Sequence, residues 1–221
     1  VDVYREPGTL PRDGEWVFVP LEIICRHYLA GSGWRRYQRG ELKAEDFGFP
    51  EGTIISQGDK LPAPCIEITT KFEPFDRVID VDEALEIANI SREELDSLTD
   101  AVIKIDHLIQ READKCGLIH VDGKKEFALG PNRVPVLVDS FGTLDEDRWW
   151  DAKAYAEGEI IQLSKEFVRE HYIETGHQNE LRSARDSGEE EPPIPALPQS
   201  VIDDTASLYA SMFERLTGEE F

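Results

Sequence analysis

The stretch from Gly117 to Trp150 constrains the fold of this 221-residue chain more than any other segment. Two apolar runs, Leu118–Val121 and Val134–Val138, flank a shorter one around Phe127 and Leu129. Runs that are rich in Val, Ile and Leu and interrupted by Gly and Pro are typical of strands joined by tight turns. The stretch therefore predicts three short strands of an antiparallel sheet.

Charged residues lie at the ends of these runs. Side chains alternate across a strand, so Asp122, Lys124 and Glu126 should share one face of an extended backbone. Asp139 follows directly on the next run. Two carboxylates on neighbouring strands, with a lysine between them, could hold a divalent cation beside a phosphate. The alternative is a hairpin with a solvated charged face.

The clearest helices are predicted at Val81–Asn89 and Ser91–Cys116. Ser91 and Glu94 have the spacing of a capping box. Apolar residues then recur at steps of three and four, which forms a stripe that the second helix would bury against the strands. The stripe consists of Leu95, Leu98, Val102, Ile105, Ile109 and Ala113.

The C-terminal quarter predicts two more helices, Ser164–Thr175 and Pro198–Leu216, around a linker-like insertion at 176–198. The expected buried side of the first helix is Phe167, Val168 and Tyr172, and that of the second is Ile202, Ala206, Tyr209, Phe213 and Leu216. Together these elements predict an α+β fold in which an antiparallel sheet is packed with helices.

The N-terminal segment Glu15–Ala30 predicts a pair of strands, with Pro20 at an edge or hinge between them. The following segment, Gly31–Gly40, is a Gly-rich turn with a basic patch made of Arg35, Arg36 and Arg39, and Arg26 lies upstream. Backbone amides in such a turn, together with guanidinium groups, form a candidate phosphate site. The alternative is an exposed basic loop.

Charge and composition limit the partners of the protein. The net charge of −22 argues against nucleic acid as a partner, because binding to its backbone requires positive charge. No apolar run approaches the roughly 20 residues that cross a membrane. The three widely spaced cysteines, Cys25, Cys65 and Cys116, predict reduced thiols and a cytoplasmic location. An acidic surface with little lysine is also what a high-salt cytoplasm would favour.

Motifs of one known family are distributed over 16–221. The first two segments are VPLEIICRHYLAGSG, through Pro20, Glu22, Arg26, Gly31 and Ser32, and ITTKFEPFD, through Lys71. The next two are CGLIHVDGKKEFALG, through Asp122, Lys124, Glu126 and Phe127, and LVDSFGTLDEDRWWD, through Asp139, Thr143, Asp145, Arg148 and Trp150. The last two are LSKEFVRE, through Lys165, Phe167 and Arg169, and the closing LPQSVIDDTASLYASMFERLTG. These segments resemble the phosphoribosylaminoimidazole-succinocarboxamide synthase (SAICAR synthetase) family.

The resemblance implies a two-lobed, ATP-grasp-related fold and an ATP-dependent ligase of de novo purine biosynthesis. Such an enzyme joins L-aspartate to carboxyaminoimidazole ribonucleotide through an acyl phosphate and forms ADP and phosphate. ATP and Mg²⁺ are the implied cofactors, with Glu126 and Asp139 as metal ligands. The remaining implied roles are catalysis for Lys71, Lys124 and Asp122, substrate binding for Arg26, Ser32, Arg148, Lys165 and Arg169, and adenine contacts for Phe18, Val19 and Glu22.

Departures from the family pattern bear on the domain organisation. Ser140 stands where the family has Glu, and Leu144 stands where it has Pro. The Gly-rich hairpin of the nucleotide lobe is not found, so residues 1–20 are expected to be the remnant of that lobe and its hinge, and 21–221 to form the substrate and ATP domain. Three explanations are open for the lobe: the sequence is truncated, a second polypeptide supplies the lobe, or ATP is no longer used well. A homo-oligomer or a partner chain that supplies the lobe is thus one of the alternatives. The alternatives are a non-catalytic or partner-dependent nucleotide-binding domain and a related small-molecule kinase.

Overall fold

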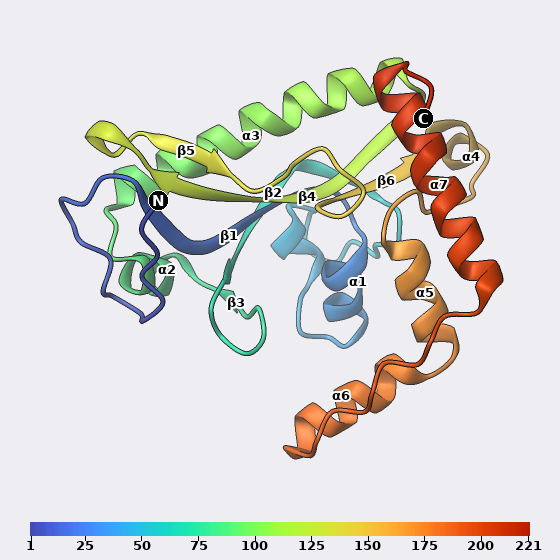
Figure 1. The fold of residues 1–221 in the computed structure, drawn as a ribbon, viewed down its shortest axis with the longest axis horizontal. Helices are drawn as coiled ribbons and strands as arrows, with labels where there is room; N and C mark the ends of the chain where they lie inside the picture. The colour runs from blue at the N-terminus through green and yellow to red at the C-terminus, as the bar shows by residue number, and fades with distance from the viewer.

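The computed structural model describes residues 1–221, and a six-stranded antiparallel sheet forms its centre (Figure 1). The strands lie in the order β3-β2-β1-β4-β5, and β6 pairs with the other half of β4. Their bounds are Val17–Tyr28 for β1, Lys60–Thr70 for β2, Val78–Ile79 for β3, Leu118–Leu129 for β4, Pro135–Val138 for β5 and Asp147–Asp151 for β6. The predicted α+β fold with an antiparallel sheet is confirmed.

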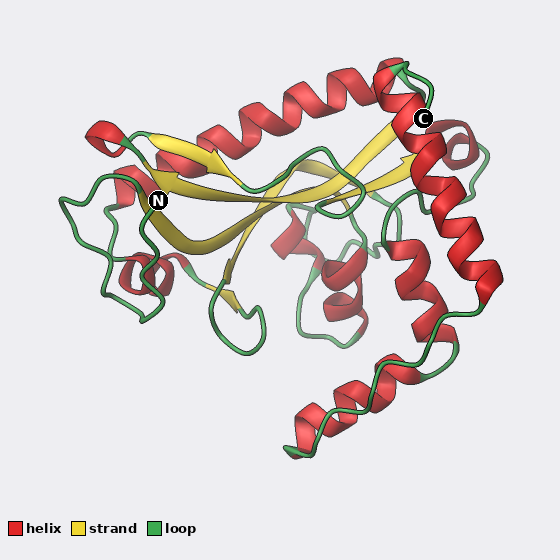
Figure 2. Cartoon of the chain, viewed as in Figure 1, coloured by secondary structure: helices red, strands yellow, loops and turns green.

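Seven α-helices surround this sheet (Figure 2). Their bounds are Gly31–Gln38 for α1, Val81–Ala88 for α2, Arg92–Lys115 for α3, Ala152–Ala156 for α4, Glu166–Glu174 for α5, His177–Ser187 for α6 and Gln199–Thr217 for α7. Two short 3-10 turns lie at Ala44–Phe47 and Pro131–Arg133. No helix combines the length and the apolar character that crossing a membrane requires.

Helix α3 lies along one face of the sheet and closes the main core, as Figure 1 shows. Its predicted capping box is present, because the Ser91 side chain accepts from the Glu94 amide and the Glu94 carboxylate accepts from the Ser91 amide. Such a cap stabilises a helix by about 1 kcal/mol. Leu95, Leu98 and Val102 are buried against the strands, as the stripe predicted.

The strands are longer than the sequence pattern predicted. β1 runs unbroken through Pro20, where two strands were expected, and the pairing with β4 shifts register between Phe18 and Glu22. A proline is tolerated in a strand at such an irregularity, because no ladder hydrogen bond is lost there. β4 likewise joins two runs that were expected to be separate strands, since Gly123 pairs with Cys25 without a break.

Three helical details also differ from the predictions. The Gly-rich segment after β1 is the helix α1 and not a loop, and the segment that was expected to be a linker contains α6. Figure 1 shows α6 projecting from the rest of the molecule. Helix α7 packs through Leu208, Tyr209, Met212 and Leu216, whereas Ile202, Ala206 and Phe213 are exposed. The predicted stripe was therefore partly on the wrong face.

Candidate active site

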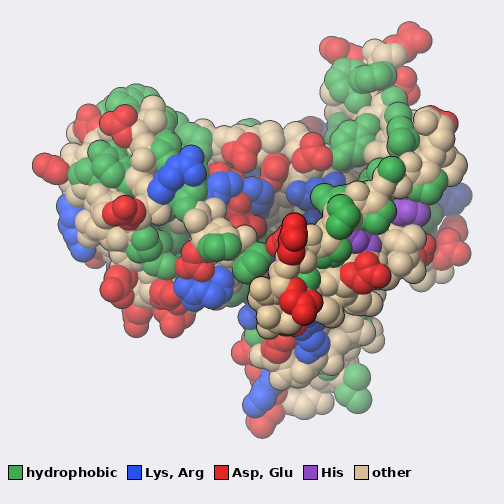
Figure 3. All heavy atoms as spheres, turned by 60° about the horizontal axis from the view of Figure 1, so that its bottom comes forward, with side chains coloured by type: hydrophobic (Ala, Val, Ile, Leu, Met, Phe, Trp, Pro, Cys, Tyr) green, Lys and Arg blue, Asp and Glu red, His purple; other side chains and the backbone are tan.

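The face of β1 and β4 that points away from α3 carries charged side chains. Glu22 lies opposite Glu126 in the register, and Arg26 lies opposite Asp122. Because side chains alternate across a strand, the polar residues of both strands share this face. Figure 3 shows lysine and arginine side chains in the hollowed middle of the surface, among acidic ones. The prediction that Asp122, Lys124 and Glu126 share one face is confirmed.

Two lysines and two glutamates form a first group, which we call the lysine cluster: Lys71, Lys124, Glu22 and Glu126. The Lys124 Nζ atom lies 2.9 Å from Glu22 Oε1 and 2.5 Å from Glu126 Oε1. The Lys71 Nζ atom, just beyond β2, lies 3.1 Å and 2.6 Å from the same two oxygens. Each ammonium group therefore bridges both carboxylates.

Within the lysine cluster, the contacts of Lys124 and Glu22 favour the charged forms of both groups. Burial alone would lower the pKa of Lys124, but the hydrogen bonds to Glu126 and Glu22 outweigh it and raise the pKa. Burial would raise the pKa of Glu22, but the hydrogen bond from Lys124 lowers it. Positive and negative charges consequently persist side by side on this face at neutral pH.

Two further carboxylates approach Lys124 from the loop between β5 and β6, which comprises 139–146. Asp139 Oδ2 lies 3.9 Å and Glu146 Oε2 lies 3.2 Å from the Lys124 Nζ atom. Glu146 Oε2 is buried, and its contact with Lys124 is an ion pair without the geometry of a hydrogen bond. Glu126 pairs with Val138, the residue before Asp139, so the two predicted metal ligands lie on neighbouring strands and both carboxylates are within 4 Å of the Lys124 Nζ atom.

A second group, the arginine cluster, lies further along the same face and consists of Arg26, Arg148, Asp122, Glu67 and Glu166. Arg26 donates to Asp122 at 2.7 Å, to Glu67 at 2.6 Å and to the Ser32 hydroxyl at 2.8 Å. Arg148 donates to Asp122 and Glu166. The carboxylates thus fix both guanidinium groups in place.

Glu166 shows how strongly the arginine cluster is coupled. Burial by itself would raise the pKa of Glu166, but the charges of Arg148 and Arg169 lower it to about 2. Arg169 donates to the same carboxylate at 2.8 Å. Because Glu166 also binds Arg148, this hydrogen bond places Arg169 beside the arginine cluster.

A cleft of about 640 Å³ joins the two clusters. Five arginines line it, namely Arg26, Arg35, Arg36, Arg148 and Arg169, together with Ser32, Glu22 and Thr69 among its polar residues. The start of α1 forms part of its wall, and a Cβ atom at Gly31 would collide with the Arg148 guanidinium. Anionic ligands are favoured here, because arginine pairs with phosphate or carboxylate through two parallel hydrogen bonds.

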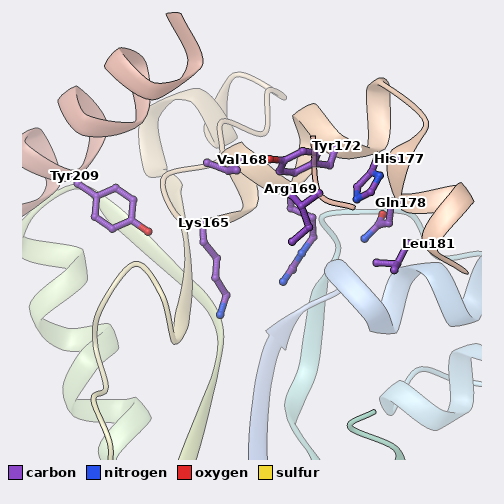
Figure 4. A pocket seen from close by; sticks show the side chains of 9 residues that line it. Lys165, Val168, Arg169, Tyr172, His177, Gln178, Leu181 and Tyr209 are labelled. Atoms are coloured by element: carbon purple, nitrogen blue, oxygen red, sulfur yellow. The ribbon is translucent and has the colours of Figure 1, made fainter. Parts of the chain in front are cut away.

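A second cavity, of about 420 Å³, lies between α5, α6 and α7 and adjoins the cleft. Figure 4 shows the Lys165 side chain, at the start of α5, and the Arg169 side chain, one turn further on, both extending toward the sheet, with Tyr172 and His177 close to Arg169. Lys165 also lines a small cavity with Asp122 and Arg148, so it lies beside the arginine cluster.

The predicted adenine contacts are less closely grouped. Phe18 is half-buried, and its ring centroid lies 5.7 Å from that of Phe72. The Val19 side chain is packed in the core under α3, so only its backbone is available to a ligand. Glu22 alone of the three belongs to the lysine cluster.

The sequence reasoning did not identify three carboxylates of the site. Glu67 comes from β2, Glu146 from the loop before β6 and Glu166 from α5. The alternation of Glu67 and Thr69 along an expected strand was a usable signal for one face of β2. Nothing local distinguishes Glu146 or Glu166 from the other acidic residues of so acidic a chain.

Comparisons with a protein-family model and with individual relatives indicate the same family. The family SAICAR synthetase matches residues 15–184. The phosphoribosylaminoimidazole-succinocarboxamide synthase of Thermoplasma acidophilum is 48% identical over 99% of this chain and 74% of its own length. The synthase of the same name from Thermoplasma volcanium is 44% identical over 92% of this chain and 68% of its own length.

Solved structures show the same fold. The SAICAR synthase of Saccharomyces cerevisiae, complexed with SAICAR, is similar with a TM-score of 0.69 and 24% identity, over 92% of this chain and 62% of that one. A SAICAR synthetase in complex with ADP is similar with a TM-score of 0.63 and 24% identity, over 98% of this chain and 73% of that one. By the sequence matches, this chain belongs to the SAICAR synthetase family, the family of an ATP-dependent ligase of purine biosynthesis.

Proposed function

We propose that the cleft between the lysine and arginine clusters is where this protein carries out the reaction of its family, the ATP-dependent joining of L-aspartate to carboxyaminoimidazole ribonucleotide. One observation carries the assignment: four carboxylates converge on Lys124 directly beside an arginine-lined cleft. The first arrangement suits a cation with its nucleotide phosphates, and the second suits a sugar phosphate. The three free cysteines support a reducing, cytoplasmic location.

The chemistry explains why both halves are needed. A carboxylate is a poor acyl donor, because its charge repels a nucleophile and oxide is a poor leaving group. An oxygen of the substrate carboxylate therefore takes the γ-phosphoryl group of ATP and releases ADP. The aspartate amine then attacks the acyl carbon, and phosphate leaves as the amide forms. Phosphoryl transfer of this kind depends on positioning and charge neutralisation more than on acid–base catalysis.

The oxygen donors at the lysine cluster fit a magnesium ion. Glu126 and Asp139 would hold it, and Glu146 Oε2, which is buried and contacts the same Lys124 ammonium group, is a third carboxylate oxygen at this position. Hard carboxylate oxygens are the ligands that Mg²⁺ prefers. When bound, the ion neutralises phosphate charge.

The other predicted residues take roles that follow from their contacts. Lys71 and Lys124 would pair with anionic oxygens of the reacting groups, with Asp122 orienting the ribonucleotide. Arg26, Ser32 and Arg148 would bind its 5′-phosphate. Lys165 and Arg169, at the side of the cleft next to α5, would neutralise aspartate. Phe18, the backbone of Val19 and Glu22 would face the adenine.

Substitution of Asp139 tests the assignment. Asp139→Asn removes a charge from an exposed side chain, so the fold should persist while product formation falls by about a hundredfold or more. The measurement is aspartate-dependent ADP release, with circular dichroism for the fold. Asp100→Asn on the outer face of α3 is the matched control. Near-normal product formation by Asp139→Asn would remove the metal assignment.

A further inference from the structure

A buried polar cluster lies on the other face of the sheet, beneath α3. It is centred on Lys125 and consists of Lys125, Asp106, Asp147, His120 and His27. The Lys125 Nζ atom lies 2.9 Å from Asp106 Oδ1 and 2.8 Å from Asp147 Oδ1. No residue of this buried cluster has a role in the function proposed above.

The ligand types of the buried cluster resemble those of a metal centre, since Asp106, His120 and Asp147 offer ligand atoms within 4.8 Å of one another. Lys125, however, already supplies a positive charge between the two carboxylates. Gly123 makes room for this arrangement, because a Cβ atom there would collide with Asp147 Oδ1 and the Lys125 Nζ atom. The buried cluster is therefore an ion-pair network around a fully buried lysine.

Asp147 connects this network to the active site. One carboxylate oxygen, Oδ1, faces the buried cluster and accepts from Lys125 at 2.8 Å and pairs with His120 Nε2 at 2.6 Å. The other oxygen, Oδ2, accepts from the Gly142 amide at 2.6 Å. Gly142 lies in the middle of the 139–146 loop, which begins with Asp139 and ends with Glu146.

We propose that Asp147 is a positioning residue for magnesium binding: Lys125 and His120 fix one of its oxygens, and its other oxygen holds the loop that presents Asp139 and Glu146 to the cleft. The proposal rests on the assignment of Asp139 as a metal ligand. A residue that orients metal ligands through hydrogen bonds typically changes metal affinity by about 10- to 100-fold when it is replaced.

The surroundings of Asp147 support this role. The Asp147 side chain is buried, and both of its oxygens have partners: Lys125 and His120 on one side and the Gly142 amide on the other. The Asp147 amide donates to the Thr143 carbonyl at 3.0 Å, and the Trp149 indole donates to the same carbonyl at 3.2 Å. Hydrogen bonds at two successive loop residues, Gly142 and Thr143, thus connect the 139–146 loop to β6.

Asp147→Asn is the decisive variant. An amide group has one acceptor oxygen, so asparagine can serve the buried side or Gly142 but not both. Asp106→Asn is the matched control, because it makes the same change in the same buried cluster and Asp106 has no hydrogen bond to the loop.

Two measurements separate the outcomes. In the metal-free protein, amide hydrogen exchange at Gly142 should be at least about tenfold faster in Asp147→Asn than in Asp106→Asn. Binding of Mn²⁺ in the presence of ATP, followed by electron paramagnetic resonance, should weaken about tenfold or more in Asp147→Asn and little in the control. Equal changes in both variants would overturn the proposal and leave general destabilisation as the cause.

The wild-type protein provides a test that does not depend on a variant folding. The Gly142 amide should exchange slowly even without metal, and exchange at the rate of an unstructured peptide would overturn the proposal. Mn²⁺ binding that is identical in wild type and Asp139→Asn would instead refute the metal assignment. The exchange rate of Gly142 would still decide whether Asp147 holds the loop.

Discussion

Arg148 is the residue that shares Asp122 with Arg26 and reaches Glu166 on α5. Its guanidinium group lies beside Gly31 at the start of α1, in the wall of the cleft. A single side chain thus joins β4, β6, α1 and α5 at the proposed phosphate site.

Replacing Arg148 by alanine should raise the KM for the ribonucleotide by about tenfold or more, since a charged hydrogen bond contributes roughly 1.5–3 kcal/mol. The KM for aspartate should change little. Steady-state kinetics with each substrate varied in turn measures both constants. Arg148→Lys, which keeps the charge but loses the planar fork, should be intermediate. Equal increases in both KM values would place Arg148 outside the phosphate site.

Glu166 should make stability depend on pH in the acid range. Its pKa is about 2 in the folded protein, against an ordinary value of 4.5. A carboxyl group with a depressed folded-state pKa stabilises the fold fully above pH 4.5, and this contribution is lost as the pH falls toward 2. The depression corresponds to roughly 3 kcal/mol.

The measurement is urea unfolding of wild type and Glu166→Gln at several pH values from 7 to 2.5. The difference in unfolding free energy between the two proteins should shrink as the pH falls below 4.5. A difference that stays constant over this range would show that Glu166 has an ordinary pKa in the folded protein.

Helix α1 forms part of the cleft wall, and its first residue, Gly31, leaves space for the Arg148 side chain. Gly31 and Gly40, at the two ends of the α1 segment, both have positive φ values, of 54° and 73°. A Cβ atom at Gly31 would collide with the Arg148 guanidinium. A Cβ atom at Gly40 would have no neighbouring atom within 4 Å.

Alanine at either glycine should lower the free energy of unfolding by about 1–2 kcal/mol, which is the cost of a left-handed conformation for a residue with a side chain. Only Gly31→Ala should also raise the KM for the ribonucleotide, since it displaces Arg148. Thermal unfolding and steady-state kinetics on the two variants measure these effects. A rise in KM for Gly40→Ala of the same size would mean that the effect is not due to Arg148.

The whole molecule carries 46 acidic and 24 basic residues, and its acidic excess opposes a compact state. Salt screens this repulsion, because the Debye length falls from about 10 Å at 0.1 M to about 3 Å at 1 M. The melting temperature should therefore rise between 0.1 and 1 M KCl at pH 7.

Calorimetry over this range checks the prediction. The same series near pH 4.5, the isoelectric point, is the control, because the net charge there is close to zero. The rise should be much smaller at that pH. A melting temperature that does not respond to KCl at pH 7 would show that self-repulsion is unimportant and would remove the reason to expect a high-salt cytoplasm.

The periodicity of the sequence predicted much of this fold and part of the candidate site. Alternation along β4 placed Asp122, Lys124 and Glu126 on one face, and the capping box and stripe of α3 identified the helix that covers the other face. These features depend on neighbours a few residues apart, so a sequence read by itself determines them. The lengths of β1 and β4 were underestimated, because proline and glycine were interpreted as breaks although the sheet accommodates both.

Only the tertiary structure decided which charges meet. Arg26 forms ion pairs with Glu67 and Asp122, which are 41 and 96 residues away in the sequence. Lys125 forms ion pairs with Asp106 and Asp147 beneath α3. The strength of an ion pair depends on the distance between its groups and on their burial, which arise when distant strands and helices pack together. Local pattern therefore determined which residues face the cleft, and packing determined what each of them contacts.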